Sequence, residues 1–478
     1  MTTRATAGLL RRAFFLALCL SSVGLQGCGL GWLYMRIGDS HRIHGAKILE
    51  YDTTADRFRK AQESYKRALQ YYQDSLLYDQ VGNLDLYHKY GFTYLQLSPP
   101  DLDNARKQFE EGLKVKREKA DKAGTTDTLA TTADEDYSQM NAGMGTVVFW
   151  TAIATKQEEK LEEALKYYAS SEATSTHVTA KHGGFFDKAM DWMNLREFLT
   201  PVPARVLAAR VHLYRARKLQ ERGHADRAKT DLNNAKEAIE DALINFPDDP
   251  RALAEQARMH YLKGEFEACV KVLKDLSGKR SYADEVENSL LRARALVELG
   301  KPDDAIAIFT EIHDRFASLG ASGDSEEDKS KTLTSAIKKR NANVKETQDK
   351  SVEAASEPVE RDPSNIQSVI GRAHAFAAKG ELQSATADVE YVLRLDPKDP
   401  RLFLEAGKAF MTLKNYDSAI SRLLAGYYID TKDIAINYWL GKAYEASGKK
   451  DEMRDCFRRV FNLDPTSSFA KEVQVHLK

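Results

Sequence analysis

Few residues of this 478-residue chain have the types and spacing that catalysis or metal binding requires. His41 and His44 stand three residues apart, so both imidazoles would share one face of a helix. Two histidines without further ligands rarely hold a metal ion, and no cysteine or histidine set has zinc spacing. The acidic pair Glu326-Glu327 lies in a polar stretch, where solvated carboxylates are expected. We therefore predict no catalytic residue, no metal site and no cofactor, and hence no enzyme.

Charge and composition narrow the class of protein. The chain has 70 Lys and Arg against 71 Asp and Glu, a net charge of −1, which gives no indication of nucleic-acid binding. Only 27 Gly and 12 Pro occur, and strand-type alternation is hard to find, so we predict an all-α fold. Four cysteines are too few for a disulfide framework. Cys269 and Cys456 are predicted to be packed thiols in different parts of the fold.

The N-terminus has the pattern of an export signal. Arginines at positions 4, 11 and 12 precede an apolar run over 13–25, which predicts a secretory signal peptide over 1–27. The sequence Leu25-Gln26-Gly27-Cys28 then resembles the lipobox of bacterial lipoproteins. The resemblance implies that Cys28 is diacylated and starts the mature protein, with 28–39 as a tether. Gly29 after it favours the outer membrane, where the protein would lie on the periplasmic face.

Two other interpretations of the N-terminus stay open. Apolar residues continue to Met35, so 13–35 is long enough for an uncleaved transmembrane anchor. The protein would then sit in the inner membrane with a periplasmic domain. Arg11-Arg12 also resembles a twin-arginine export signal, although a pair of arginines is common in ordinary Sec signals. In each case the folded part lies outside the cytoplasm.

The stretch 366–465 repeats itself every 34 residues. Small, aromatic and small residues recur at helical spacing in two blocks, separated by a short turn and closed in two of the three repeats by a proline. The aligned positions include Ala373, Gly407 and Gly441, then Phe376, Phe410 and Tyr444, then Ala385, Ala419 and Met453. This period and pattern resemble the tetratricopeptide repeat family. The resemblance implies helical hairpins stacked into a right-handed α-solenoid that binds other proteins.

The same pattern, applied to the whole chain, predicts its organisation. The region 40–200 is helical and irregular, with repeat-like segments. A repeat block occupies 203–319, and three repeats with a C-terminal cap helix occupy 366–478. Between these blocks, 320–365 has no aromatic residue and is dense in charged side chains, so we expect a disordered or loosely helical insertion. We predict seven to nine hairpins.

One stretch before the first regular block concentrates large apolar side chains. The segment 183–200 contains Phe185, Phe186, Trp192 and Met193. Apolar side chains at helical spacing are usually core, so a helix packed inside the solenoid is the simplest interpretation. The alternatives are a surface that docks on a partner or membrane, or an apolar pocket for a small ligand.

A row of basic residues follows the small position in six first helices. In tetratricopeptide repeats this position points into the concave groove, so we name these residues the groove row: Arg217, Arg258, Arg294, His374, Lys408 and Lys442. Such a row would attract an acidic or extended protein segment, unless it is merely an exposed position that tolerates Lys and Arg. Of the adjacent Tyr438 and Trp439, one should also face the groove. The asparagine with which some family members clamp a terminal carboxylate is absent.

These features together predict a non-enzymatic lipoprotein scaffold with protein partners and no nucleic acid. Lipoproteins with such repeats often take part in assembling envelope machines for secretion, pili, motility or polysaccharide export. The alternative function is a solute-binding component of a periplasmic transport system, which would require the apolar pocket around 185–193.

Overall fold

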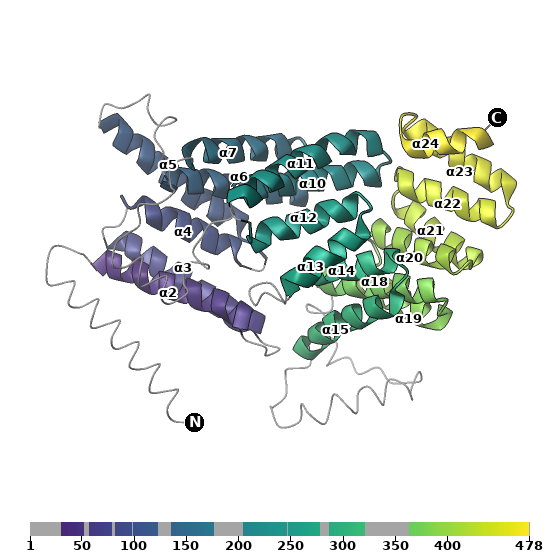
Figure 1. Cartoon of the computed structure of the whole chain (residues 1–478), viewed down its shortest axis with the longest axis horizontal. Coiled ribbons are helices and arrows are strands. Elements are labelled where there is room, and N and C mark those ends of the chain that lie inside the picture. The colour runs from purple at the N-terminus through teal and green to yellow at the C-terminus, as the bar shows by residue number, and fades with distance from the viewer. Residues whose placement is uncertain are drawn as a thin grey trace, which may run out of the picture. The chain divides into compact units, whose positions relative to one another are not determined.

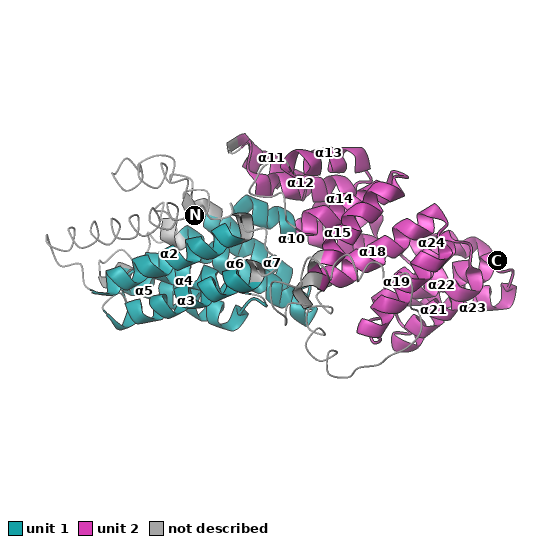
Figure 2. Cartoon of the chain, turned by 90° about the horizontal axis from the view of Figure 1, so that it is seen from below, with its two compact units in different colours: residues 1–211 teal, residues 212–478 magenta. Residues whose placement is uncertain are grey.

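The computed structural model describes residues 30–51, 57–78, 82–97, 99–122, 135–175, 204–245, 247–277, 286–320 and 363–477. Helices are the only regular elements in these ranges, which confirms the all-α prediction (Figure 1). The chain forms two compact units, 1–211 and 212–478 (Figure 2). The sequence predicted a boundary between two regions of the chain near 200–203. The two compact units instead divide inside one helix, α10 (Ala204–Glu221).

The first unit contains three antiparallel hairpins in its described part. Their helices are α2 (Leu30–Tyr51) with α3 (Arg57–Leu77), α4 (Leu84–Leu95) with α5 (Leu102–Lys122), and α6 (Glu135–Thr155) with α7 (Lys160–Ser175). Helix α2 begins at Leu30, ten residues earlier than the predicted helical region, because Met35 and Gly38 pack into the core against α3. No described helix is long and apolar enough to cross a membrane.

The second unit continues with hairpins of more regular length. Its helices are α11 (Ala225–Asn245), α12 (Pro250–Leu262), α13 (Phe266–Ser277), α14 (Val286–Glu298), α15 (Pro302–Gly320), α18 (Pro363–Lys379), α19 (Leu382–Leu395), α20 (Pro400–Thr412), α21 (Tyr416–Ile429), α22 (Ile434–Ala446), α23 (Lys450–Leu463) and α24 (Ser468–Val473). With α10, this gives nine hairpins over the described residues of both units, which agrees with the predicted seven to nine. The α24 segment and the 3-10 turn after it form the expected C-terminal cap.

The hairpins close because a small residue on one helix faces a large one on its partner. A Cβ atom built at Gly407 would lie 2.4 Å from Leu423 Cγ, and one at Gly441 would lie 2.3 Å from Phe457 Cε1. Real Cβ atoms do not approach this closely, so glycine allows the two helices to pack in van der Waals contact. In α2 the same role falls to Gly38, which faces Tyr72. The small-to-large pattern of the sequence is therefore the packing rule of the fold.

The two repeat blocks meet directly although 320–365 separates them in sequence. Helices α15 and α18 pack against each other, and Gly371 on α18 faces the buried ring of Phe309 on α15. Residues 321–362, nearly all of the predicted insertion, lie outside the described residues. The blocks therefore form one continuous solenoid in the second unit.

The second unit also closes on itself. The Ser468 backbone N–H donates to the carbonyl of Gly223 at 2.8 Å, and Asp464 Oδ2 lies 2.8 Å from His224 Nε2. The turn between α10 and α11 thus contacts the turn between α23 and α24. This contact brings the first and last hairpins of the unit together.

Candidate binding groove

Every member of the groove row lies on the first helix of a hairpin. The helices, in order, are α10, α12, α14, α18, α20 and α22. Neighbouring first helices contact each other in four pairs along this row: α12 with α14, α14 with α18, α18 with α20, and α20 with α22. Most of the side chains are half-buried, and only Arg217 is more than half exposed. The residues therefore form one wall that solvent still reaches.

Carboxylates on the same helix accompany four of the six row members. Arg258 Nη1 lies 2.6 Å from Glu255, and Lys408 Nζ lies 2.8 Å from Glu405, each three residues before the cation. The other two pairs are Arg217 with Glu221 at 2.8 Å and Lys442 with Glu445 at 2.9 Å. The wall is consequently charge-paired, and the row adds little net positive potential.

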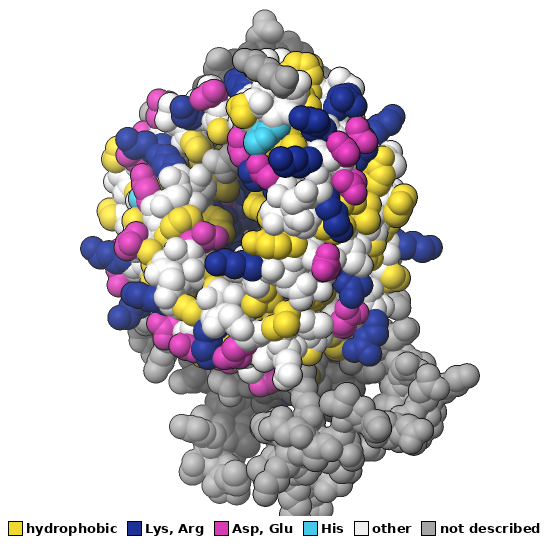
Figure 3. Space-filling view, turned by 90° about the vertical axis from the view of Figure 1, so that its right-hand side faces the viewer, with side chains coloured by type: hydrophobic (Ala, Val, Ile, Leu, Met, Phe, Trp, Pro, Cys, Tyr) yellow, Lys and Arg dark blue, Asp and Glu magenta, His cyan; other side chains and the backbone are white. Residues whose placement is uncertain are grey.

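Further polar contacts join several of these first helices to a neighbouring helix. The four cross-helix contacts are Arg258 with Glu287 at 2.8 Å, Arg294 with Gln367 at 3.2 Å, His374 with Glu405 at 3.0 Å, and Lys442 with Glu472 at 3.7 Å. They link α12 to α14, α14 to α18, α18 to α20, and α22 to α24, and the step from α20 to α22 is spanned by Lys408 beside the Trp439 ring. In Figure 3, basic and acidic side chains are intermixed over the visible described surface, and a hollow opens near its centre.

Glu405 is the most strongly held carboxylate of this wall. Burial opposes its ionisation, but the adjacent His374 and Lys408 outweigh that effect and lower the pKa of Glu405 below its usual range. Arg294 is the row member without an ion pair to a described carboxylate, and burial lowers the pKa of its guanidinium. Both groups remain charged at neutral pH. The groove therefore presents fixed charges of both signs at defined positions.

The pair Tyr438 and Trp439 divides between core and groove. Tyr438 is buried, its ring stacks on Phe469 at 4.6 Å, and its hydroxyl donates to Glu472 at 2.7 Å. Trp439 is half-buried, and Lys408 Nζ lies 5.8 Å from the centre of its ring. Trp439 is thus the aromatic residue beside the groove row, while Tyr438 holds the cap helix. A half-exposed tryptophan next to a cation is a typical binding hot spot.

Other predicted residues lie elsewhere or outside the described ranges. Cys28 and the stretch 183–200 are not among the described residues.

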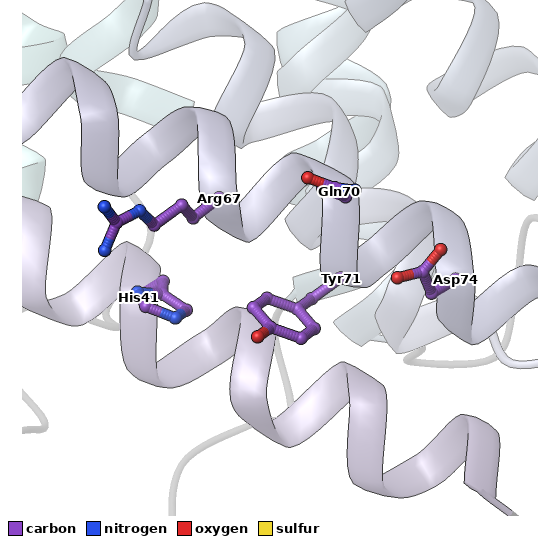
Figure 4. A pocket seen from close by; sticks show the side chains of 5 residues that line it. All are labelled: His41, Arg67, Gln70, Tyr71 and Asp74. Atoms are coloured by element: carbon purple, nitrogen blue, oxygen red, sulfur yellow. The ribbon is translucent and has the colours of Figure 1, made fainter.

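His41 stacks on Tyr71, with ring centroids 5.3 Å apart, at the edge of an open pocket of about 390 Å³. Arg67, Gln70 and Asp74 complete its lining (Figure 4). The pocket is polar and shallow, and the described residues contain no group of three or more potential metal ligands.

The two described cysteines are free and buried, as predicted. Burial raises the pKa of Cys269 to about 12 and that of Cys456 to about 11. A thiol that stays protonated at neutral pH is a poor nucleophile. Both residues therefore serve as packing side chains.

The carboxylates of the groove are the functional candidates that the sequence prediction missed. Glu255, Glu405 and Glu445 stand three residues from a row member, and side chains at this spacing are neighbours on a helix. Examining that spacing would have found them. The contacts from Glu287 and Glu472 join different helices, so no local spacing predicts them.

The fold and this groove define a class of protein, a helical repeat solenoid with a charged and partly aromatic wall. Family models for the tetratricopeptide repeat match residues 221–270, 370–435 and 434–467. The chain thus contains tetratricopeptide repeats, all matched within its second unit. This confirms the repeat assignment for the segments that contain Arg258, His374, Lys408 and Lys442.

Comparisons with individual proteins show partial similarity only. The chain is 38% identical to the human FK506-binding protein-like protein over 64 residues, which are 13% of this chain and 18% of that protein. Solved structures with partial similarity include PilW, described as a type IV pilus biogenesis factor, and MamA. PilW has 15% identity and a TM-score of 0.34, covering 56% of this chain and 98% of its own. MamA has 16% identity and a TM-score of 0.27, covering 46% and 96%.

Proposed function

We propose that this chain is a non-enzymatic scaffold that binds an acidic or extended protein segment in the groove of its second unit. A lipid on Cys28 would hold it at the periplasmic face of the outer membrane. There it would take part in assembling an envelope machine for secretion, pili, motility or polysaccharide export. The observation that carries the binding proposal is the wall of half-buried charges and Trp439 on consecutive first helices.

The paired charges suggest how such a partner binds. A carboxylate of the partner can bind Lys408 alongside Glu405, because the ammonium group has three N–H donors. Charges of both signs at fixed spacing contribute mainly to specificity and orientation. The apolar ring of Trp439 would supply binding energy beside them.

Substitutions in the groove test this function. We expect Trp439→Ala to reduce recovery of co-purified partner proteins by at least about tenfold, because an aromatic hot spot that becomes buried in a complex contributes about 2 kcal/mol or more. Lys408→Glu should act similarly, but it places two carboxylates three residues apart. The double variant Lys408→Glu with Glu405→Lys restores an ion pair between these two positions with its charges exchanged. A loss of partner recovery in this variant therefore reflects lost recognition and not lost stability. Recovery is measured by quantitative mass spectrometry.

The matched control is Tyr428→Ala on α21. Tyr428 is 76% exposed and lies on a second helix, away from the groove row. Its loss should leave partner recovery unchanged. If Trp439→Ala and the charge exchange leave recovery equal to that of wild type, the groove is not the binding site.

A further inference from the structure

Four apolar or aromatic side chains gather where α2 begins and α3 ends. Leu30 is 58% exposed, Leu77 is 76% exposed and Tyr78 is 45% exposed. Tyr34 joins them, because its ring stacks on Tyr78 with centroids 5.2 Å apart. Ser75 Oγ donates to the carbonyl of Gly31 at 2.7 Å, which holds the two helix ends together. We name Leu30, Tyr34, Leu77 and Tyr78 the tip.

Core packing does not account for the exposure of the tip. The same helices bury Met35 and Tyr72 almost completely. A single exposed leucine is normal on a protein surface, but these leucines lie beside stacked tyrosine rings at one end of a hairpin. Tyrosine has an apolar ring and a polar hydroxyl, and it is enriched where a membrane meets water.

The sequence before the tip indicates what covers it. Cys28 precedes Leu30 by two residues in the sequence, and two residues of chain span at most roughly 7 Å. A lipid on Cys28 would place a bilayer there. In the alternative of an uncleaved anchor, the apolar stretch 13–35 includes Leu30 and Tyr34 of the tip. Both forms of membrane attachment therefore bring lipid to the same place.

The order of residues along α2 matches the depth profile of a bilayer surface. Leu30 comes first, followed by the half-buried Trp32 and Tyr34. Arg36 lies one turn after Trp32, and its guanidinium carbon is 5.2 Å from the centre of the Trp32 ring. Apolar, then aromatic, then basic residues suit hydrocarbon, interface and phosphate headgroups in turn. We propose that the tip inserts into the phospholipid surface beside the membrane attachment point and orients the first unit on it.

This inference rests on the proposed membrane attachment, and one experiment separates the two. The full chain is incorporated into vesicles of phosphatidylethanolamine and phosphatidylglycerol that contain brominated phosphatidylcholine. Leu77→Cys carries a nitrobenzoxadiazole fluorophore, which bromine quenches at short range. Of the four cysteines, Cys269 and Cys456 are buried with raised pKa values and should not react, and in the proposed lipoprotein Cys19 is removed with the signal peptide and Cys28 is acylated. The parent chain without an added cysteine supplies the labelling blank.

Two labelled control positions accompany Leu77. Ile244→Cys on α11 matches its exposure at 76%. Glu63→Cys lies on the same helix, fourteen residues away, which is roughly 21 Å along the axis. We expect quenching at residue 77 to exceed that at 63 and 244 by at least about twofold. Cys28→Ser shows whether flotation depends on the lipid or on the apolar segment.

The outcomes are distinct. Strong quenching at residue 77 in vesicles that carry the protein supports the tip. If the protein floats with the vesicles but residues 77 and 63 are quenched equally, the tip does not insert and the attachment still stands. If wild-type protein does not float with vesicles, the proposed attachment is wrong and the tip inference falls with it.

Discussion

The half-buried cations of the groove row lie beside carboxylates of the same chain. At Lys408 and Arg258 these acids are Glu405 and Glu255, which neutralise the charge of each cation. The basic residues follow a small residue in each repeat, so the sequence predicted them. The carboxylates that pair with these basic residues differ in their spacing and in the helix on which they lie. For this reason the sequence did not predict that the charges of the wall would be paired.

A buried histidine gives the first unit a pH-dependent stability. Burial lowers the pKa of His88 from 6.5 to about 4, and the nearby Asp85 offsets only part of that effect. Below pH 6.5 His88 therefore binds a proton in the unfolded chain, whereas in the folded chain it stays neutral until about pH 4. Folding stability should fall as the pH drops through this window, by about 2 kcal/mol between pH 7 and pH 5.

The comparison with His88→Gln isolates this effect. Melting temperatures followed by circular dichroism should decline more steeply for wild type than for the variant between pH 7 and pH 5. The lowered pKa values of Asp85 and Glu405 place their titration below this range. Parallel curves for the two proteins would show that His88 is not the titrating group.

At the scale of the helix pair, the close contact of Gly407 with Leu423 decides how α20 and α21 pack. In an isolated helix, alanine is more stable than glycine by about 1 kcal/mol. Here the added methyl would approach Leu423 Cγ to 2.4 Å, so we expect Gly407→Ala to destabilise the second unit by about 1–3 kcal/mol. Denaturant unfolding measures the change.

A double-mutant cycle provides the control. In a Leu423→Ala background the obstructing side chain is absent, so Gly407→Ala should cost far less or become favourable. Equal costs in both backgrounds would mean that the contact does not determine the packing. The repeat pattern predicted this helix pair because both residues occupy regular positions. It missed α2, whose small residues, Gly38 and Gly45, lie outside the regular blocks.

At the scale of the second unit, the fold depends on a contact that no repeat pattern contains. The sequence predicted stacked hairpins but not that the turn at Gly223 would meet the turn at Ser468. Nor did it predict that α15 and α18 would pack directly across the insertion, because a solenoid's curvature accumulates from small rotations between repeats. The repeat pattern describes positions within one hairpin, whereas these two contacts join segments that are distant in sequence.

The central claim, that the groove binds a protein partner, is tested most directly by site-specific photo-crosslinking in the native host. A photoreactive amino acid replaces Trp439 beside the groove row in one full-length protein and the exposed Tyr428 on α21 in another. The account predicts a discrete crosslinked protein from position 439 and none from position 428. The same adducts from both positions, or adducts from position 428 alone, would contradict it.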